Sequence, residues 1–213
     1  MRPLTLATLE HQLARALSGP LPGPAAQGRM APAPRPGWQP GRVPGGLRDA
    51  AALALFYPRA GAPHLLLTVR AADLPHHGGQ ISLPGGEVEP GESIEDAALR
   101  EADEEVGVDR ASVRLLGRLS AMHIPVSGYA LHTVVGIANT AGAWVPHARE
   151  VARVLEAPLD ALLDPARRAV ETRRYEGRDY DVPFYEVEGE KVWGATAMVL
   201  AELLALLTVD ESE

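Results

Sequence analysis

The chain of 213 residues contains no cysteine. Disulfide bridges, thiolate zinc sites and a cysteine nucleophile are therefore excluded. No apolar run approaches the roughly 18 residues that a membrane-spanning helix needs. The N-terminus also lacks a basic stretch followed by an apolar stretch and a small-residue cleavage site. We therefore expect a cytoplasmic protein that does not associate with membranes.

Basic residues are fewer than acidic residues in this sequence. The sequence has 20 Lys and Arg against 28 Asp and Glu, for a formal net charge of −8, which argues against duplex nucleic acid as a partner. It lacks a Gly-x-x-x-x-Gly-Lys-Ser/Thr phosphate loop, a Gly-x-Gly-x-x-Gly dinucleotide fingerprint and a His-Glu-x-x-His zinc pair. Ser82 has no nucleophile-elbow context. No other common catalytic motif therefore competes with the acidic motif that is present.

That acidic motif occupies residues 86–108. Its frame is Gly86, five residues, Glu92, seven residues, Arg100-Glu101, two residues, Glu104-Glu105, one residue and Gly107. Seven specified residues at fixed offsets arise by chance about 10⁻⁸ times per position. Ser93 followed by Asp96 is typical of a capping box, and Gly107 of a C-terminal stop. The pattern predicts a helix over residues 94–106.

This predicted helix groups carboxylates on one face. Glu101, Glu104 and Glu105 are neighbours there because residues i, i+3 and i+4 lie close together. Such a cluster is commonly a solvated acidic face, but a divalent cation such as Mg²⁺ converts its repulsion into binding. Arg100 can hold one carboxylate with its charged fork, and Gly85 lets a backbone oxygen approach an ion closely. We interpret the unit as a Mg²⁺ site that grips a diphosphate, and Glu92 as a structural partner of Arg100 or of loop amides.

Residues 86–108 resemble the Nudix box. The resemblance implies a Nudix hydrolase of the α/β class, an α/β/α sandwich with a mixed β-sheet that hydrolyses a nucleoside diphosphate linked to another group. By the box pattern, Glu101, Glu104 and Glu105 carry over as metal ligands and Arg100 as the residue that orients them. The Gly85 carbonyl is a further ligand on this pattern. The implied cofactor is Mg²⁺, with Mn²⁺ as a substitute.

Three other stretches resemble the coenzyme A (CoA) pyrophosphatase subfamily. They are residues 66–71 with 77–86, residues 150–159 and residues 192–197. The resemblance covers about residues 48–207 and implies hydrolysis of CoA and its derivatives to 3′,5′-ADP and 4′-phosphopantetheine. Pro75 departs from the pattern by standing where an Arg is expected, and Leu83 replaces a Phe. ADP-ribose, NADH and dinucleotide polyphosphates therefore stay open as substrates, and so does a ligand-sensing module that binds without cleaving.

Four residues outside the box are candidates for substrate binding or catalysis. Arg70 could bind the diphosphate or the 3′-phosphate, or be a surface residue at a strand end. His77 could contact a substrate phosphate or only support its loop, and Tyr129 could stack on adenine or pantetheine. Glu150 is an exposed acid, an additional metal ligand or the base that activates water. These alternatives stay open at the level of sequence, as does the oligomeric state.

The chain divides by composition near residue 47. Residues 4–17 predict a short helix with Leu9, Leu13 and Leu17 on one stripe. Residues 19–46 are dense in Pro, Gly and Ala, which predicts disorder or surface-draped coil. We therefore divide the chain into residues 1–46, a short helix and a Pro/Gly/Ala-rich arm, and residues 47–213, the Nudix hydrolase domain. An arm that reaches a neighbouring subunit is an alternative.

The second part mixes predicted strands with helices. Apolar runs predict strands over residues 51–57, 64–69, 113–119, 131–138, 151–155, 182–187 and 191–193. Helices are expected over residues 159–163 and 195–207, and a charged, solvent-facing hairpin region over 167–181. The first two strands predict a hairpin because a turn-rich segment separates them. This mixture suits a sheet sandwiched between helices.

Overall fold

The structure is a computed structural model that describes residues 4–73 and 78–208. Its helices are α1 (Leu6–Leu17), α2 (Gly23–Gln27), α3 (Ile94–Val106), α4 (Leu159–Leu163) and α5 (Gly194–Ala205), with short 3-10 turns at η1 (Gly28–Met30), η2 (Arg110–Ser112) and η3 (Pro165–Arg167). Within the described ranges, no helix is long and apolar enough to cross a membrane.

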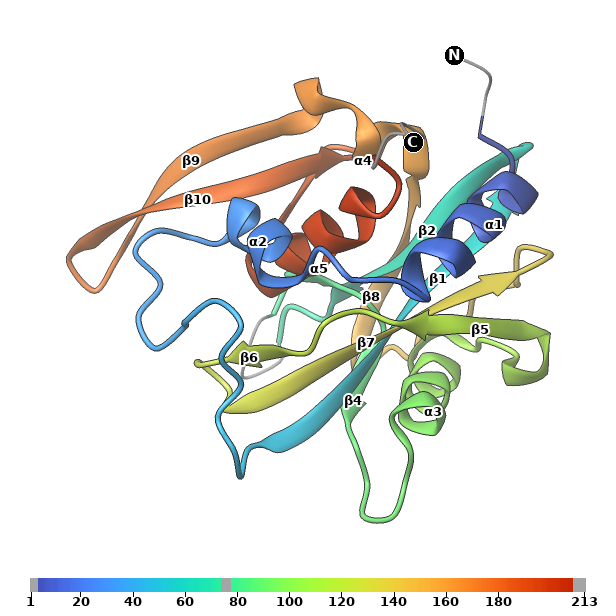
Figure 1. The fold of residues 1–213 in the computed structure, drawn as a ribbon, viewed down its shortest axis with the longest axis horizontal. Coiled ribbons are helices and arrows are strands. Elements are labelled where there is room, and N and C mark those ends of the chain that lie inside the picture. The colour runs from blue at the N-terminus through green and yellow to red at the C-terminus, as the bar shows by residue number, and fades with distance from the viewer. Residues whose placement is uncertain (1–3, 74–77, 209–213) are drawn as a thin grey trace.

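The described residues form a mixed sheet of eight strands (Figure 1). Its strands are β1 (Arg48–Arg59), β2 (Ala62–Arg70), β3 (Ile81–Ser82), β4 (Gly85–Glu87), β5 (Val113–Arg118), β6 (Met122–Ile124), β7 (Tyr129–Ala138) and β8 (Val151–Pro158). The main path runs β3-β2-β1-β7-β5, with β4 paired to β1, β6 to β7 and β8 to β2. Strands β1 and β7 are parallel and the other pairs are antiparallel.

A smaller antiparallel sheet has the order β11-β10-β9. It consists of β9 (Arg168–Tyr175), β10 (Arg178–Val187) and β11 (Glu190–Trp193). Figure 1 shows the β9–β10 hairpin extending away from the main sheet. The expected charged hairpin is confirmed, and β10 begins earlier than its apolar run because residues 178–181 pair with residues 172–175 of β9.

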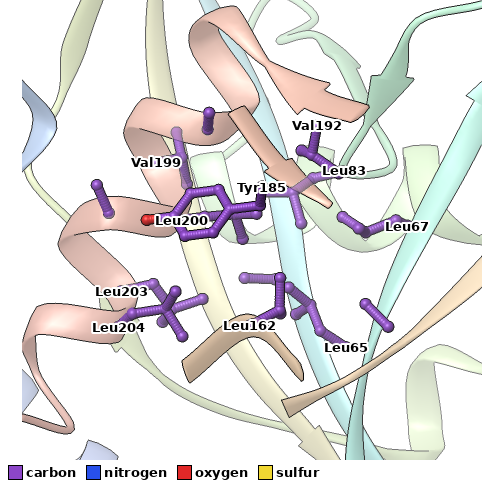
Figure 2. Close-up of a cluster of buried hydrophobic side chains, with 14 of the residues drawn as sticks. Leu65, Leu67, Leu83, Leu162, Tyr185, Val192, Val199, Leu200, Leu203 and Leu204 are labelled. Atoms are coloured by element: carbon purple, nitrogen blue, oxygen red, sulfur yellow. The ribbon is translucent and has the colours of Figure 1, made fainter. Parts of the chain in front are cut away.

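Strand β1 separates two apolar layers. Its residues Ala51, Leu53, Leu55 and Tyr57 pack in one cluster with residues of α3, whereas Ala52, Ala54 and Phe56 pack in another with residues of α1 and α5. Side chains alternate across a strand, so β1 contributes to both layers. Figure 2 shows Tyr185 among the leucines of the second cluster. Each fully buried leucine there contributes about 2 kcal/mol to stability.

Helix α3 has the predicted bounds and caps. The Ser93 side chain accepts a hydrogen bond from the Asp96 amide at 3.1 Å, and Gly107 takes the left-handed conformation at φ 72°. The predicted hairpin of β1 and β2 is also confirmed, with Phe56 opposite Leu65. These signals act over a few neighbouring residues, and the structure contains the elements that they predict.

The prediction of coil over residues 19–46 is wrong for residues 23–30, which form α2 and η1. Gln27 is 2% exposed, and its Nε2 donates to Glu202 Oε2 at 2.7 Å and to the Ser120 carbonyl at 3.2 Å. The Ser120 amide donates to Glu202 Oε1 at 3.0 Å. Polar partners that are far away in the sequence hold this segment in place. The amino-acid composition of the segment does not reveal these partners. The division of the chain near residue 47 stays a prediction.

Candidate functional site

Helix α3 and strand β4 meet where two glycines remove side-chain bulk. A Cβ on Gly86 would lie 2.4 Å from the carboxylate carbon of Glu101, and a Cβ on Gly85 would lie 2.3 Å from the Ala51 carbonyl oxygen. Any side chain at either position would displace its neighbour. The glycine pair thus brings the backbone of β4 against a helix carboxylate.

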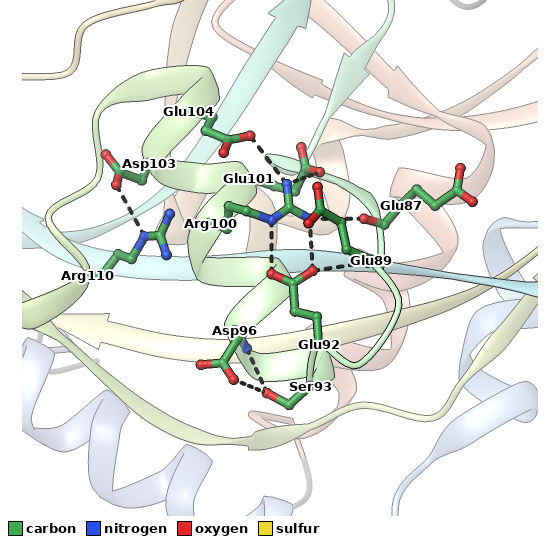
Figure 3. A network of polar contacts seen from close by, with 10 residues as sticks. All are labelled: Glu87, Glu89, Glu92, Ser93, Asp96, Arg100, Glu101, Asp103, Glu104 and Arg110. Carbon is green, nitrogen blue, oxygen red and sulfur yellow. Dashed lines mark hydrogen bonds and ion pairs between the residues drawn. The ribbon is translucent and has the colours of Figure 1, made fainter.

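Arg100 ties the loop before α3 to the helix (Figure 3). Its Nε donates to Glu92 Oε1 at 2.9 Å and its Nη2 to Glu92 Oε2 at 2.9 Å. Nη2 also donates to the Glu87 carbonyl at 3.0 Å, and the Glu89 amide donates to Glu92 Oε2 at 3.1 Å. The hydrogen bonds from Arg100 hold the pKa of Glu92 below its ordinary value. The predicted structural role of Glu92 is confirmed, and its partners include both Arg100 and a loop amide.

The same guanidinium orients two box carboxylates. Arg100 Nη1 donates to Glu101 Oε1 at 2.8 Å and to Glu104 Oε2 at 3.3 Å. The Glu101 side chain is 15% exposed and that of Glu104 is 59% exposed. Burial raises the pKa of Glu101, Arg100 opposes that shift, and the charges of Glu104 and Glu150 add to it. Glu101 is thus a confined carboxylate, whereas Glu104 lies at the solvent boundary.

Glu105 is buried, with only 3% of its surface exposed. Its Oε1 lies 3.9 Å from Arg70 Nη1, and its Oε2 has no hydrogen-bond partner in the described part of the chain. Burial raises the pKa of Glu105 to about 8. Arg70 and the Gly85 amide oppose the shift, and the charges of Glu101 and Glu150 reinforce it. A buried carboxylate oxygen without a partner is costly, which points to a ligand at this position.

Glu150 lies in the loop before β8, which passes beside the end of α3. The His147 amide donates to the Glu105 carbonyl at 2.8 Å, where the last turn of α3 leaves carbonyls free. The Glu150 amide then donates to the His147 carbonyl at 2.9 Å, and the Ala71 amide donates to the Glu150 carbonyl at 2.9 Å. Backbone hydrogen bonds therefore hold this loop against α3. The effect of Glu150 on the pKa of both Glu101 and Glu105 reflects this proximity.

The carboxylates that the structure describes do not converge to form a complete metal site. Among the residues that the structure describes, no three acidic or histidine side chains converge closely enough to hold an ion. The donor set nevertheless fits a hard divalent cation, because its carboxylates repel one another and the free oxygen of Glu105 is buried. The space left by Gly86 lies beside Glu101. Glu104 turns toward Arg100 and would have to rotate to join them.

The other candidates have different surroundings. Arg70 ends β2, and its buried Nε has no hydrogen-bond partner among the described residues. Tyr129 is the first residue of β7, and its hydroxyl donates to Glu87 Oε2 at 2.6 Å. His77 lies outside the described residues. Glu87 was not singled out from the sequence, because its contact with Tyr129 joins residues 42 positions apart.

Comparison with known proteins places the motif in a family. Residues 46–176 match the NUDIX domain family model. The chain is 34% identical over 142 residues to the Nudix hydrolase NudL of Photorhabdus laumondii subsp. laumondii, covering 66% of this chain and 75% of that protein. It is 34% identical over 148 residues to NudL of Yersinia pestis, covering 69% and 74% of the two chains.

A solved structure shares the fold. The crystal structure of the Nudix hydrolase RenU from M. smegmatis aligns with a TM-score of 0.55 and 23% identity, over 84% of this chain and 99% of that one. The expected α/β fold with a mixed sheet is thereby confirmed. The glycine and carboxylate motif lies inside the matched range of residues. This chain belongs to the Nudix family of hydrolases, which act on phosphorus anhydrides.

Proposed function

We propose that this Nudix hydrolase cleaves the diphosphate bond of CoA and its derivatives, giving 3′,5′-ADP and 4′-phosphopantetheine. The observation that carries the hydrolytic part is the buried carboxylate of Glu105, which has a free oxygen and lies near Glu101 and Glu150. CoA as the substrate rests on the resemblance of residues 66–71, 77–86, 150–159 and 192–197 to the CoA pyrophosphatase subfamily.

The residues that would hold Mg²⁺, or Mn²⁺ in its place, are Glu101, Glu104, Glu105 and the Gly85 carbonyl. When bound, the cation supplies positive charge that offsets the charge of the diphosphate oxygens. Arg100 holds the Glu101 carboxylate in place through its hydrogen bond of 2.8 Å. Orientation of this kind lowers the barrier because the reacting groups are already arranged.

The reaction transfers one substituted phosphoryl group of the diphosphate to water. The water oxygen forms a bond to one phosphorus, the bridging P–O bond breaks, and a carboxylate takes the water proton. Glu150 is our candidate for this base, since its charge acts on Glu101 and Glu105 and it is not part of the helix. The leaving phosphomonoester is a weak base, so the reaction does not require a dedicated acid.

Arg70 is the candidate contact for the diphosphate. Its side chain is 28% exposed, and its nearest acidic partner is the Glu105 oxygen at 3.9 Å. A guanidinium that is partly buried and loosely paired suits a phosphate oxygen, which it can bind with two parallel hydrogen bonds. His77 remains a proposed phosphate contact from the sequence.

A metal-dependent substrate panel with product identification tests the proposal. CoA, 3′-dephospho-CoA, ADP-ribose, NADH and a dinucleotide polyphosphate are compared with Mg²⁺ and with Mn²⁺, and the Glu105→Gln variant serves as the inactive control. We expect CoA to have the highest kcat/KM and to give the two named products. A higher kcat/KM for ADP-ribose or NADH would overturn CoA as the substrate. Binding of these compounds without any product would indicate a sensing module.

A further inference from the structure

Three side chains at the ends of neighbouring strands form a compact cluster. The Arg48 guanidinium carbon lies 4.4 Å from the centre of the Tyr129 ring. The Tyr129 hydroxyl donates to Glu87 Oε2 at 2.6 Å, and Arg48 Nη1 donates to the same oxygen at 3.1 Å. Arg48 of β1 pairs in register with Tyr129 of β7. Each member is thus held by both others, which fixes the plane of the guanidinium against the ring.

This cluster adjoins the candidate diphosphate site through β4. Glu87 follows Gly86, the glycine that approaches Glu101, and its carbonyl accepts a hydrogen bond from Arg100 at 3.0 Å. Successive side chains of a strand point to opposite faces, so the Glu87 carboxylate leaves β4 on the side away from α3. Figure 3 shows this carboxylate directed away from Arg100. Glu87 is the residue after Gly86 and the last residue of β4, so a group attached to a diphosphate at Gly86 would reach the cluster by passing the end of this strand.

The charge and exposure of the cluster indicate what it can bind. The Arg48 side chain is 63% exposed and that of Glu87 is 50% exposed, so the guanidinium presents a flat surface to solvent. Its charge is already balanced by Glu87, which disfavours a further phosphate. Planar guanidinium groups stack on aromatic rings. These features together favour a neutral planar ring as the ligand.

We propose that Arg48 and Tyr129, held by Glu87, form a platform on which the purine base of the nucleotide substrate stacks. The proposal rests on the proposed function, since it places the diphosphate of the same substrate at Gly86. Arg48 and Tyr129 would thereby favour diphosphates that carry a base over diphosphates without one, and they would contribute to binding without taking part in bond cleavage.

Two non-hydrolysable ligands test this platform by titration calorimetry in the presence of Mg²⁺. Adenosine α,β-methylene diphosphate carries the base, and methylenediphosphonate carries only the diphosphate mimic. Base stacking on protein side chains is worth about 1–3 kcal/mol, so we expect Arg48→Ala to weaken binding of the nucleotide analogue about tenfold. Binding of methylenediphosphonate should be unchanged.

Two further variants separate stacking from charge and from general damage. Arg48→Lys keeps the charge but loses the planar group, so it should weaken nucleotide binding as Arg48→Ala does. Arg173→Ala is the matched control, because it removes a second guanidinium stack, 4.2 Å from the centre of the Trp193 ring in the other sheet. It should leave both affinities unchanged, and thermal melts of all variants report any loss of folding.

The outcomes distinguish this proposal from the proposed function. The stacking platform alone would be overturned if Arg48→Lys bound the nucleotide analogue with wild-type affinity. It would also be overturned if Arg48→Ala weakened the binding of both ligands equally. Base-selective loss of binding in a protein that fails to hydrolyse CoA would overturn the substrate assignment alone. If the wild-type protein hydrolysed CoA but bound neither analogue in Mg²⁺, the stacking platform alone would fall.

Discussion

The guanidinium of Arg100 binds both carboxylate oxygens of Glu92, with Nε 2.9 Å from Oε1 and Nη2 2.9 Å from Oε2. Glu92 lies in the loop before α3, and Arg100 lies within the helix. The pair therefore closes the loop onto the helix with two parallel hydrogen bonds. Because Arg100 also donates to Glu101, one side chain connects loop closure to the orientation of a proposed metal ligand.

Arg100→Lys should lower kcat at least tenfold at saturating Mg²⁺ and lower the Tm by a few degrees. A lysine ammonium lacks the planar fork that serves Glu92 and Glu101 at once. Steady-state kinetics and thermal melts measure the two effects. Arg110→Lys is the matched control, since Arg110 lies outside this network and pairs with Asp103 at 3.1 Å. Equal kcat values for the two variants would contradict the orienting role of Arg100.

Gly86→Ala should lower kcat about 100-fold while the protein remains folded. The new Cβ would lie 2.4 Å from the Glu101 carboxylate, and the flexible glutamate would move before the backbone does. Kinetics at varied Mg²⁺ and a circular dichroism spectrum test this expectation. Gly45→Ala is the control, because a Cβ there meets nothing within 4 Å. Normal kcat in Gly86→Ala would mean that the position of Glu101 does not matter for turnover.

Glu105→Gln should reduce turnover at saturating Mg²⁺ at least 100-fold. The amide keeps the shape of the side chain but loses the negative charge that a divalent cation requires. Asp103→Asn is the matched control on the same helix, since the Asp103 side chain is 49% exposed and pairs with Arg110. Turnover near the wild-type rate in Glu105→Gln would overturn the ligand assignment.

The stability of the metal-free protein should depend on pH through Glu105. Burial raises its pKa from an ordinary 4.5 to about 8, so the folded state favours the protonated acid. The contribution to stability is full below pH 4.5 and is lost as the pH rises through about 8. Glu105→Gln should therefore gain Tm over the wild type as the pH rises from 5 to 9 in a chelator. A Tm difference that does not change with pH would refute this.

Addition of Mg²⁺ at pH 8 should raise the Tm of the wild type more than the Tm of Glu105→Gln. The cation stabilises the charged form of Glu105, so the Tm of the wild type should rise. The Tm of Glu105→Gln should rise much less, because one of its charged ligands is missing. Differential scanning fluorimetry across a Mg²⁺ series measures both responses. Equal increases would place the cation elsewhere.

Gln27→Ala should lower the free energy of unfolding by about 1–3 kcal/mol, because the buried Glu202 carboxylate loses a hydrogen-bond donor. Urea denaturation measures the loss. Gln39→Ala is the control, since Gln39 is exposed and contacts Arg42 at 2.9 Å. An unchanged free energy in Gln27→Ala would mean that the hydrogen bonds of Gln27 to Glu202 and Ser120 contribute nothing to stability.

Local signals carried the prediction of α3. Ser93 and Gly107 act within a few residues of the helix ends, so the sequence predicts the bounds that the structure has. The role of Glu92 was also accessible, since the loop and helix are contiguous and Arg100 is eight residues away. The family motif and the proposed chemistry belong to this same continuous stretch.

Helix periodicity alone predicted that the three box carboxylates lie closer together than they do in the structure. Glu101, Glu104 and Glu105 share a helix face, yet Glu104 is largely exposed and Glu105 is buried. Spacing defines the direction in which a side chain leaves the helix. Contact with Arg100, Gly86 and Arg70 decides where each carboxylate lies, and burial raises the pKa of Glu101 and Glu105.

The sequence by itself therefore determined the family, the helix that carries the acidic residues and the loop contact that closes on it, because these depend on neighbours in the chain. Only the tertiary structure decided the placement of Glu150, the docking of Gln27 against Glu202 and the cluster of Arg48 with Glu87 and Tyr129. These contacts join residues from separate strands, loops and helices. Their partners are defined by packing and strand register, which short-range patterns in a chain do not encode.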